Sequence, residues 1–145
     1  HLLTNLRRIA WISERREVPM LLVTPVSAVT CRPMDLTSQG SGSPLDLWER
    51  GMALRDSEPA EALRLLQAAR DGDPASVRAP SIAAVAFRSF DQSGVTVLDA
   101  DQLLPREPGL DAPAEALFVD GLHLSEWGHT RLADLVAPRV EALLE

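Results

Sequence analysis

The chain has 145 residues, 46% of them hydrophobic, and a formal net charge of −7. This length and composition predict one folded domain, and the negative charge argues against nucleic acid or an anionic membrane as a partner. All 14 basic residues are arginines and Cys31 is the only cysteine, which excludes lysine-dependent chemistry, an internal disulfide and a multi-cysteine metal site.

The first 24 residues predict a helix followed by a strand. Apolar residues recur at helical spacing, at Leu2, Leu6, Ile9 and Ala10. The helix is expected to end before Pro19, because the residue preceding a proline avoids the α region. Residues 20–24 form an apolar run closed by Pro25, which predicts a strand buried on both faces, as in a parallel sheet between helices.

The middle of the chain predicts a loop and then a helical hairpin. Residues 27–43 are rich in turn formers and follow the carboxyl end of the predicted strand, where ligands bind in open α/β sheets. Two interpretations stay open: a loop that lines a substrate site, or a surface loop. Residues 44–75 resemble one tetratricopeptide-type hairpin. A single unit cannot bury its own apolar face, so we interpret it as an insertion packed on the domain.

A third helix and a second strand follow. The helix is expected to begin at residues 78–80 and to end before Gly94. The apolar run Val95–Leu98 predicts a second buried strand. Asp99 and Asp101 come directly after that strand. Carboxylates in this position can be catalytic, but they more often form turns and helix caps, and we interpret them as structural.

The stretch from Phe118 to His129 carries the strongest chemical signal. Asp120 and His123 lie three residues apart, just before a helix expected to begin near Ser125. A carboxylate so placed can accept a hydrogen bond from His Nδ1, which fixes the tautomer and leaves Nε2 free to take a proton from a nucleophile. We therefore predict a buried acid that holds an imidazole, two parts of a nucleophile–His–acid constellation.

A family resemblance rests on the same residues. Asp120-Gly-Leu-His123-Leu-Ser-Glu-Trp-Gly128-His129, followed by Arg131-Leu-Ala-Asp134, resembles the last sequence block of the SGNH (GDSL-type) lipase/acylhydrolase family. Residues 15–25 and 95–99 resemble, more weakly, that family's late helix-to-strand segment and its last strand. The resemblance implies a serine esterase in which His123 is the general base and Asp120 orients it.

The resemblance also implies an architecture. SGNH hydrolases have a three-layer α/β/α fold with a mostly parallel, flavodoxin-like sheet. Residues 1–145 would form the C-terminal part of one such domain, with residues 44–75 as an insertion. The chain opens directly on a helical pattern, with no initial methionine and no leading strand, so we expect further polypeptide upstream of residue 1.

Several catalytic parts of that family are absent from these residues. The nucleophile would come from a Gly-Asp-Ser motif and an oxyanion donor from Gly-x-Asn-Asp; neither motif occurs, and Asn5 is the only asparagine. Ser41 and Ser43 lie in a glycine-rich loop rather than in a strand–turn–helix setting, and we interpret neither as the nucleophile. We expect the serine and the oxyanion donors upstream of residue 1, and no esterase activity from this chain alone.

Other interpretations of these residues stay open. His123 can instead brace the C-terminal helix, the role that we expect for His129. Asp120, His123 and His129 match no zinc pattern, so no metal or other cofactor is predicted, and Cys31 is interpreted as an inert thiol. At the level of function, the alternatives are a non-catalytic helical interaction module, a pseudoenzyme, or an O-acyltransferase on the same fold.

The expected partners follow from these interpretations. The substrate would be a small-molecule ester or an O-acylated carbohydrate; the sequence does not specify its acyl and alcohol groups. No apolar run reaches the roughly 18 residues of a membrane-spanning helix, and no signal-peptide pattern indicates a compartment. Two strands alone would leave a sheet edge uncovered, so we expect pairing with a second copy or with the N-terminal half of the same protein.

Overall fold

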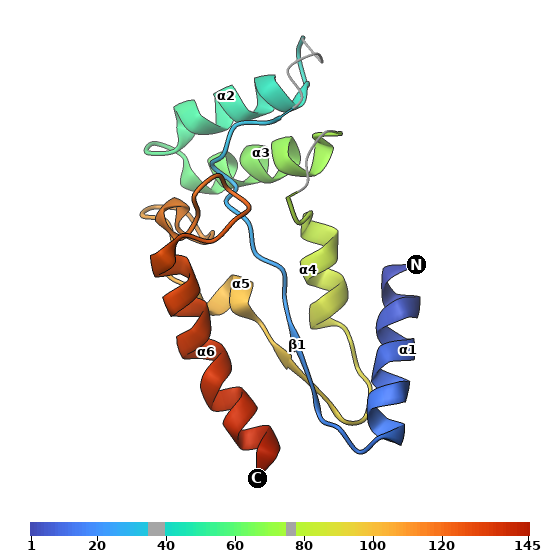
Figure 1. Ribbon diagram of the computed structural model, residues 1–145. Coiled ribbons are helices and arrows are strands. Elements are labelled where there is room, and N and C mark those ends of the chain that lie inside the picture. The colour runs from blue at the N-terminus through green and yellow to red at the C-terminus, as the bar shows by residue number, and fades with distance from the viewer. Residues whose placement is uncertain (35–39, 75–77) are drawn as a thin grey trace.

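The computed structural model describes residues 1–34, 40–74 and 78–145 (Figure 1). About 53% of it is helical, and it contains one two-stranded sheet. The elements in chain order are α1 (Leu2–Arg15), β1 (Met20–Val23), α2 (Pro44–Leu54), α3 (Pro59–Gly72), α4 (Ser81–Arg88), β2 (Val95–Leu98), α5 (Ala100–Leu103), the 3-10 helix η1 (Glu115–Leu117) and α6 (Glu126–Leu144).

The two strands pair in parallel, with Met20 opposite Val95 and Val23 opposite Leu98. Side chains alternate between the faces of a sheet, so the two faces meet different helices. On one face, Leu22 packs with Leu6 and Ala10 of α1. The other face is covered near β1's carboxyl end by α5 and α6, and Figure 1 shows α1 and α6 on opposite sides of the strands.

The predicted three-layer, flavodoxin-like sheet is wrong. The described residues contain only two paired strands of four residues each, and helices make up the rest of the regular structure. The prediction of strands buried on both faces is wrong for most positions, since only Leu22 in β1 and Leu98 in β2 are buried. Each strand has a single neighbour, and a sheet this narrow cannot enclose its strands as a wide parallel sheet does.

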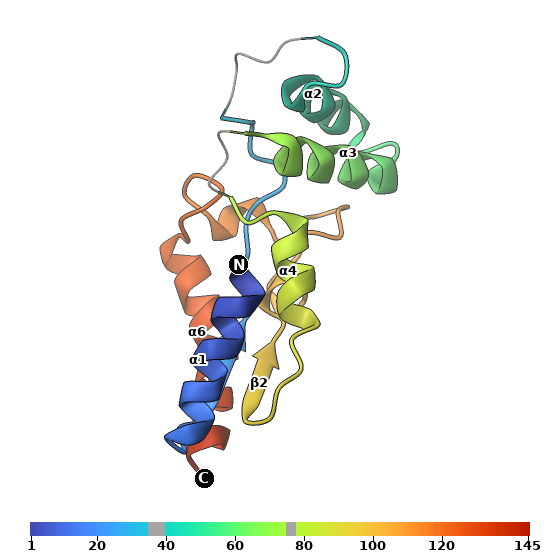
Figure 2. The ribbon, with the colours of Figure 1, turned by 90° about the vertical axis from the view of Figure 1, so that its right-hand side faces the viewer.

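The helices α2 and α3 form a hairpin that packs on the rest of the chain. Its core joins Ala62 and Leu66 of α3 to Val29 after β1 and to Leu110. A Cβ atom at Gly51 would lie 2.8 Å from Leu66 Cγ, so glycine permits this close approach of the two helices. Figures 1 and 2 both show the hairpin beyond the carboxyl ends of the strands.

The last helix is anchored at its start. Leu132 and Leu135 of α6 pack against a cluster that includes Leu104, Leu117 and Phe118. The helix continues through Pro138 to Leu144, and its later apolar residues are only partly buried or exposed. Within the described part of the chain, no helix is long and apolar enough to span a membrane.

Candidate active site

Asp120 and His123 lie in a tight turn between η1 and α6. Phe118 and Leu124 form an isolated antiparallel bridge, and the N–H of Val119 donates to the carbonyl of His123 at 2.8 Å. Gly121 has φ = +83°, a conformation that glycine adopts without strain. These bonds close the turn and bring the side chains of the predicted acid and base to the same side.

The predicted contact between acid and base is present. His123 Nδ1 lies 2.8 Å from Asp120 Oδ2. Asp120 Oδ1 accepts the backbone N–H groups of His123, at 2.8 Å, and of Leu122, at 3.1 Å. The His123 backbone N–H, then the His123 ring, then the Leu122 N–H lower the pKa of Asp120 to about 2. An ionised carboxylate at Nδ1 selects the tautomer that carries its proton there, which leaves Nε2 free.

The acid is exposed, which corrects the prediction of a buried one. The side chains of Asp120 and His123 have 54% and 74% of their surface exposed. Backbone hydrogen bonds within the turn, rather than burial, hold the carboxylate in place. A solvated imidazole can exchange protons, and it is accessible to a hydroxyl group contributed by another segment.

The first turn of α6 fixes the position of the acid–base turn. Ser125 caps the helix, because its Oγ accepts the Gly128 N–H at 3.1 Å and donates to the Ala116 carbonyl at 2.9 Å. A Cβ atom at Gly128 would lie 2.1 Å from the Leu117 carbonyl oxygen, so a larger residue would push α6 off η1. His129 is exposed, and its backbone N–H donates to the Ser125 carbonyl at 2.8 Å in the first turn of α6, so the expectation that its side chain braces the helix stays a prediction.

A pocket of about 210 Å³ lies beside the acid–base turn. Its wall comes from the turn and from two other segments: Cys31, Arg32, Met34, Arg78, Asp120, Leu122 and His123. The described start of the loop over residues 27–43 therefore lines a pocket at the candidate site; residues 35–39 of that loop lie outside the described residues. Ser41 and Ser43 do not line it, and Ser43 instead caps α2 by accepting the Asp46 N–H at 3.2 Å.

Two residues that the sequence did not single out shape this pocket. The side chains of Asp73 and Arg78 are 0% and 3% exposed, with a nitrogen–oxygen distance of 3.5 Å. Arg78 Nη1 donates to the Cys31 carbonyl at 2.6 Å, and Asp73 Oδ2 accepts the Met34 N–H at 2.7 Å. Together they hold the chain that leaves β1 against the end of α3. The sequence signal was only a helix stop at Asp73-Pro74 and a helix start near Arg78.

Cys31 is not equipped as a nucleophile. Its thiol is partly buried, and burial, followed by the charge of Glu115, raises its pKa. A raised pKa keeps the thiol protonated, and the thiolate is the reactive form. This agrees with the interpretation of Cys31 as an inert thiol.

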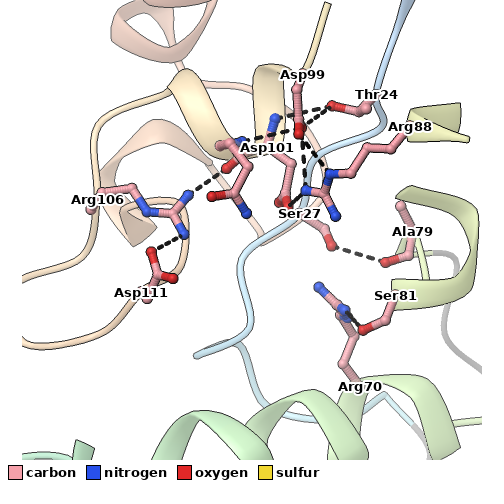
Figure 3. Close-up of polar contacts among 11 residues, drawn as sticks. Thr24, Ser27, Arg70, Ala79, Ser81, Arg88, Asp99, Asp101, Arg106 and Asp111 are labelled. Atoms are coloured by element: carbon pink, nitrogen blue, oxygen red, sulfur yellow. Dashed lines mark hydrogen bonds and ion pairs between the residues drawn. The ribbon is translucent and has the colours of Figure 1, made fainter. Parts of the chain in front are cut away.

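Asp99 and Asp101 belong to a structural network at the carboxyl ends of the strands (Figure 3). Asp99 caps α5 through the Gln102 N–H, and it bonds to Thr24 at 3.2 Å and to Arg88 at 2.6 Å. Burial alone would raise the pKa of Asp99, but the hydrogen bond and charge of Arg88 outweigh it, so the pKa is lowered. Arg88 also pairs with Asp101 at 2.5 Å. These contacts tie β2 to β1 and agree with a structural role.

Comparison of the chain with protein-family models, with curated proteins and with solved structures found no match. Across residues 1–34, 40–74 and 78–145, no group of three or more His, Cys, Asp and Glu side chains is placed to hold a metal ion. Any functional assignment therefore depends on the acid–base turn, its pocket and the sequence block around them.

Proposed function

We propose that this chain supplies the general base and its orienting acid to a serine ester hydrolase of the SGNH type. The observation that carries the proposal is the 2.8 Å contact between His123 Nδ1 and an Asp120 carboxylate that backbone N–H groups hold in place. The contact leaves the second ring nitrogen unused, on an exposed side chain beside a pocket of about 210 Å³. A general base needs this arrangement of orienting acid and accessible nitrogen.

In the proposed reaction, His123 Nε2 takes the proton of a serine hydroxyl as its oxygen attacks the ester carbonyl. The negative charge of Asp120 stabilises the imidazolium that forms. The imidazolium then gives the proton to the departing alcohol, which leaves an acyl-serine. Water attacks that acyl group in the second half-reaction, with His123 again taking and returning the proton. The pocket beside the turn would bind either the acyl group or the alcohol group of the ester.

The serine and the oxyanion donors are proposed to come from polypeptide upstream of residue 1. The 145 residues contain no Gly-Asp-Ser and no Gly-x-Asn-Asp, and neither Ser41 nor Ser43 lines the pocket. Removing even one oxyanion donor costs about 10²–10³ in rate, so the isolated chain, which lacks the nucleophile as well, is expected to be inactive. The same base would also serve an O-acyltransferase, and product analysis with a sugar acceptor distinguishes transfer from hydrolysis.

The test uses the polypeptide encoded by the complete reading frame. A fluorophosphonate probe should label a serine upstream of residue 1, and p-nitrophenyl acetate should be hydrolysed. We expect His123→Ala to abolish both labelling and turnover, and Asp120→Asn to lower turnover by about 10²–10⁴. His129→Ala is the matched control, because this exposed histidine lies on the adjacent helix and outside the pocket, and it should retain activity. Turnover that survives His123→Ala, or a reading frame with no such serine, would overturn the proposal.

A further inference from the structure

A second cavity, of about 270 Å³, lies between α3, α4 and α5 and is separate from the acid–base turn. It is bounded by α3 at Leu63, Gln67 and Arg70, by α4 at Val85, and by Gln102 in α5. Figure 3 shows Arg70 and Arg88 reaching toward this region from α3 and α4. The cavity lies at the carboxyl ends of both strands, the side of a parallel sheet on which ligands bind.

The charged groups around this α3–α4 cavity form ion pairs with one another. Each arginine pairs with at least one carboxylate, at nitrogen–oxygen distances of 2.5–3.1 Å, in the pairs Arg70–Asp71, Arg88–Asp99, Arg88–Asp101 and Arg106–Asp111. Three positive and four negative charges leave a formal charge of −1. An anion such as phosphate needs unpaired positive charge, so this wall favours a neutral ligand.

Hydrogen-bonding atoms of both kinds remain available on the wall. Among the described residues, Nη1 of Arg70 and Nη1 of Arg88 have no acceptor, although each guanidinium carries five N–H groups. One carboxylate oxygen each of Asp101 and Asp111 likewise has no donor within the described residues. A hydroxyl group both donates and accepts. Several neighbouring hydroxyls would therefore satisfy these donors and acceptors together.

The rest of the wall is apolar. Val29, Leu63, Val85 and Pro113 line the cavity between its polar groups. A cavity of about 270 Å³ holds roughly nine waters at about 30 Å³ each, enough for one ring-sized ligand. A sugar ring combines hydroxyl edges with apolar C–H faces. We propose that the α3–α4 cavity binds one neutral monosaccharide unit through Arg70, Arg88, Gln67 and Gln102.

The test is an NMR titration of the 145-residue chain. The probes are the methyl glycosides of glucose, galactose and mannose, with inorganic phosphate and acetate as anionic comparators. We expect at least one glycoside to shift the amide and side-chain signals of Gln67, Arg88 and Gln102 saturably, while the signals of Asp120 and His123 stay unchanged. The result is independent of whether His123 acts as a base, so either proposal can fail alone.

Two substitutions test the site without touching the ion pairs. The side chains of Gln67 and Gln102 line the cavity, and neither hydrogen-bonds to a described residue. The double change Gln67→Ala with Gln102→Ala should weaken glycoside binding about tenfold, the loss expected for two hydrogen bonds. Gln92→Ala is the control, since Gln92 does not line the cavity and its backbone carbonyl still accepts the Val95 N–H.

Three outcomes would overturn the proposal. In one, no glycoside gives a saturable shift at these residues. In another, the double variant binds the glycoside as tightly as the unaltered chain does. In the third, phosphate or acetate saturates the same signals at lower concentration than any glycoside, which would identify an anion site.

Discussion

The backbone N–H of Ala28 donates a hydrogen bond to the carbonyl of Gly121 at 3.0 Å. This bond joins the chain that leaves β1 to the turn that carries Asp120 and His123. The contact is close, because a Cβ atom at Gly121 would lie 2.4 Å from Cys31 Sγ and 2.7 Å from Cys31 Cβ. Glycine therefore suits position 121 for two reasons: its φ is positive, and Cys31 lies where a Cβ atom would be.

Gly121→Ala should destabilise the protein by about 2–5 kcal/mol, since a left-handed alanine costs about 1–2 kcal/mol and overpacking about 1–3 kcal/mol. Urea denaturation measures the change. Gly109→Ala is the control, because Gly109 has φ = +79° but nothing lies within 4 Å of its Cβ position. Gly109→Ala should therefore cost only the roughly 1–2 kcal/mol of a left-handed alanine. Equal losses in the two variants would mean that the contact with Cys31 relaxes freely.

The pKa of Asp120 predicts how the turn responds to pH. Hydrogen bonds in the folded state lower this pKa from 3.8 to about 2. A lowered folded-state pKa means that the carboxylate stabilises the folded protein above 3.8, and this contribution is lost as the pH falls through about 2. Asp120 should therefore be fully ionised at neutral pH. Carbon-13 detected titration of the Asp120 carboxyl group measures this directly.

The same titration in His123→Ala separates the causes. The largest is the backbone N–H of residue 123, which alanine keeps, and the imidazole is second. We expect the pKa of Asp120 in this variant to rise only part of the way toward 3.8. A complete return to 3.8 would show that the ring alone holds the carboxylate, and no change would show that the ring contributes nothing.

Ser125→Ala should cost about 0.5–2 kcal/mol, because the change removes the N-cap of α6. The hydroxyl also donates to the Ala116 carbonyl, so the loss should lie in the upper part of that range. Thermal denaturation followed by circular dichroism gives the measurement. Thr130→Ala is the control, because within the described part of the chain its hydroxyl bonds only to the Glu126 carbonyl of α6, and we expect no loss of stability. A Ser125→Ala variant as stable as this control would exclude the capping role.

The sequence predicted the local features of the molecule. Of the four apolar residues whose spacing predicts the first helix, Leu6 and Ala10 are buried, whereas Leu2 and Ile9 are exposed. The contact between Asp120 and His123 spans only three residues. Such features depend on neighbouring residues alone, so periodicity and turn chemistry are enough to predict them. The proline at residue 19 and the glycine at residue 94 likewise mark where β1 and β2 begin.

The predictions that were wrong concern features that depend on the rest of the fold. An apolar run such as Met20–Val23 looks the same in a wide sheet and in a two-stranded one, so the number of neighbouring strands was not readable. The burial predicted for Asp120 failed for a related reason, because exposure depends on what packs over the turn. Asp73 and Arg78 were missed because their partners, Met34 and Cys31, are distant in sequence.

Arg78→Met should destabilise the protein by about 3–5 kcal/mol, because it leaves the carboxylate of Asp73 buried beside the site of the lost cation. It also removes the hydrogen bond to the Cys31 carbonyl. Adding Asp73→Asn should recover part of the loss, since a neutral amide costs less to bury than a carboxylate that has lost the nearby cation. A urea-denaturation double-mutant cycle measures this coupling.

Arg64→Met is the control for that cycle. Arg64 pairs with Glu61 on the surface of α3, where solvent screens the two charges, so its loss should not change the stability measurably. If Arg78→Met also leaves the stability unchanged, the pair does not hold the chain after β1. NMR signals of Met34 and Leu122 that match those of the unaltered chain would then show that the wall of the pocket beside His123 needs no buried ion pair.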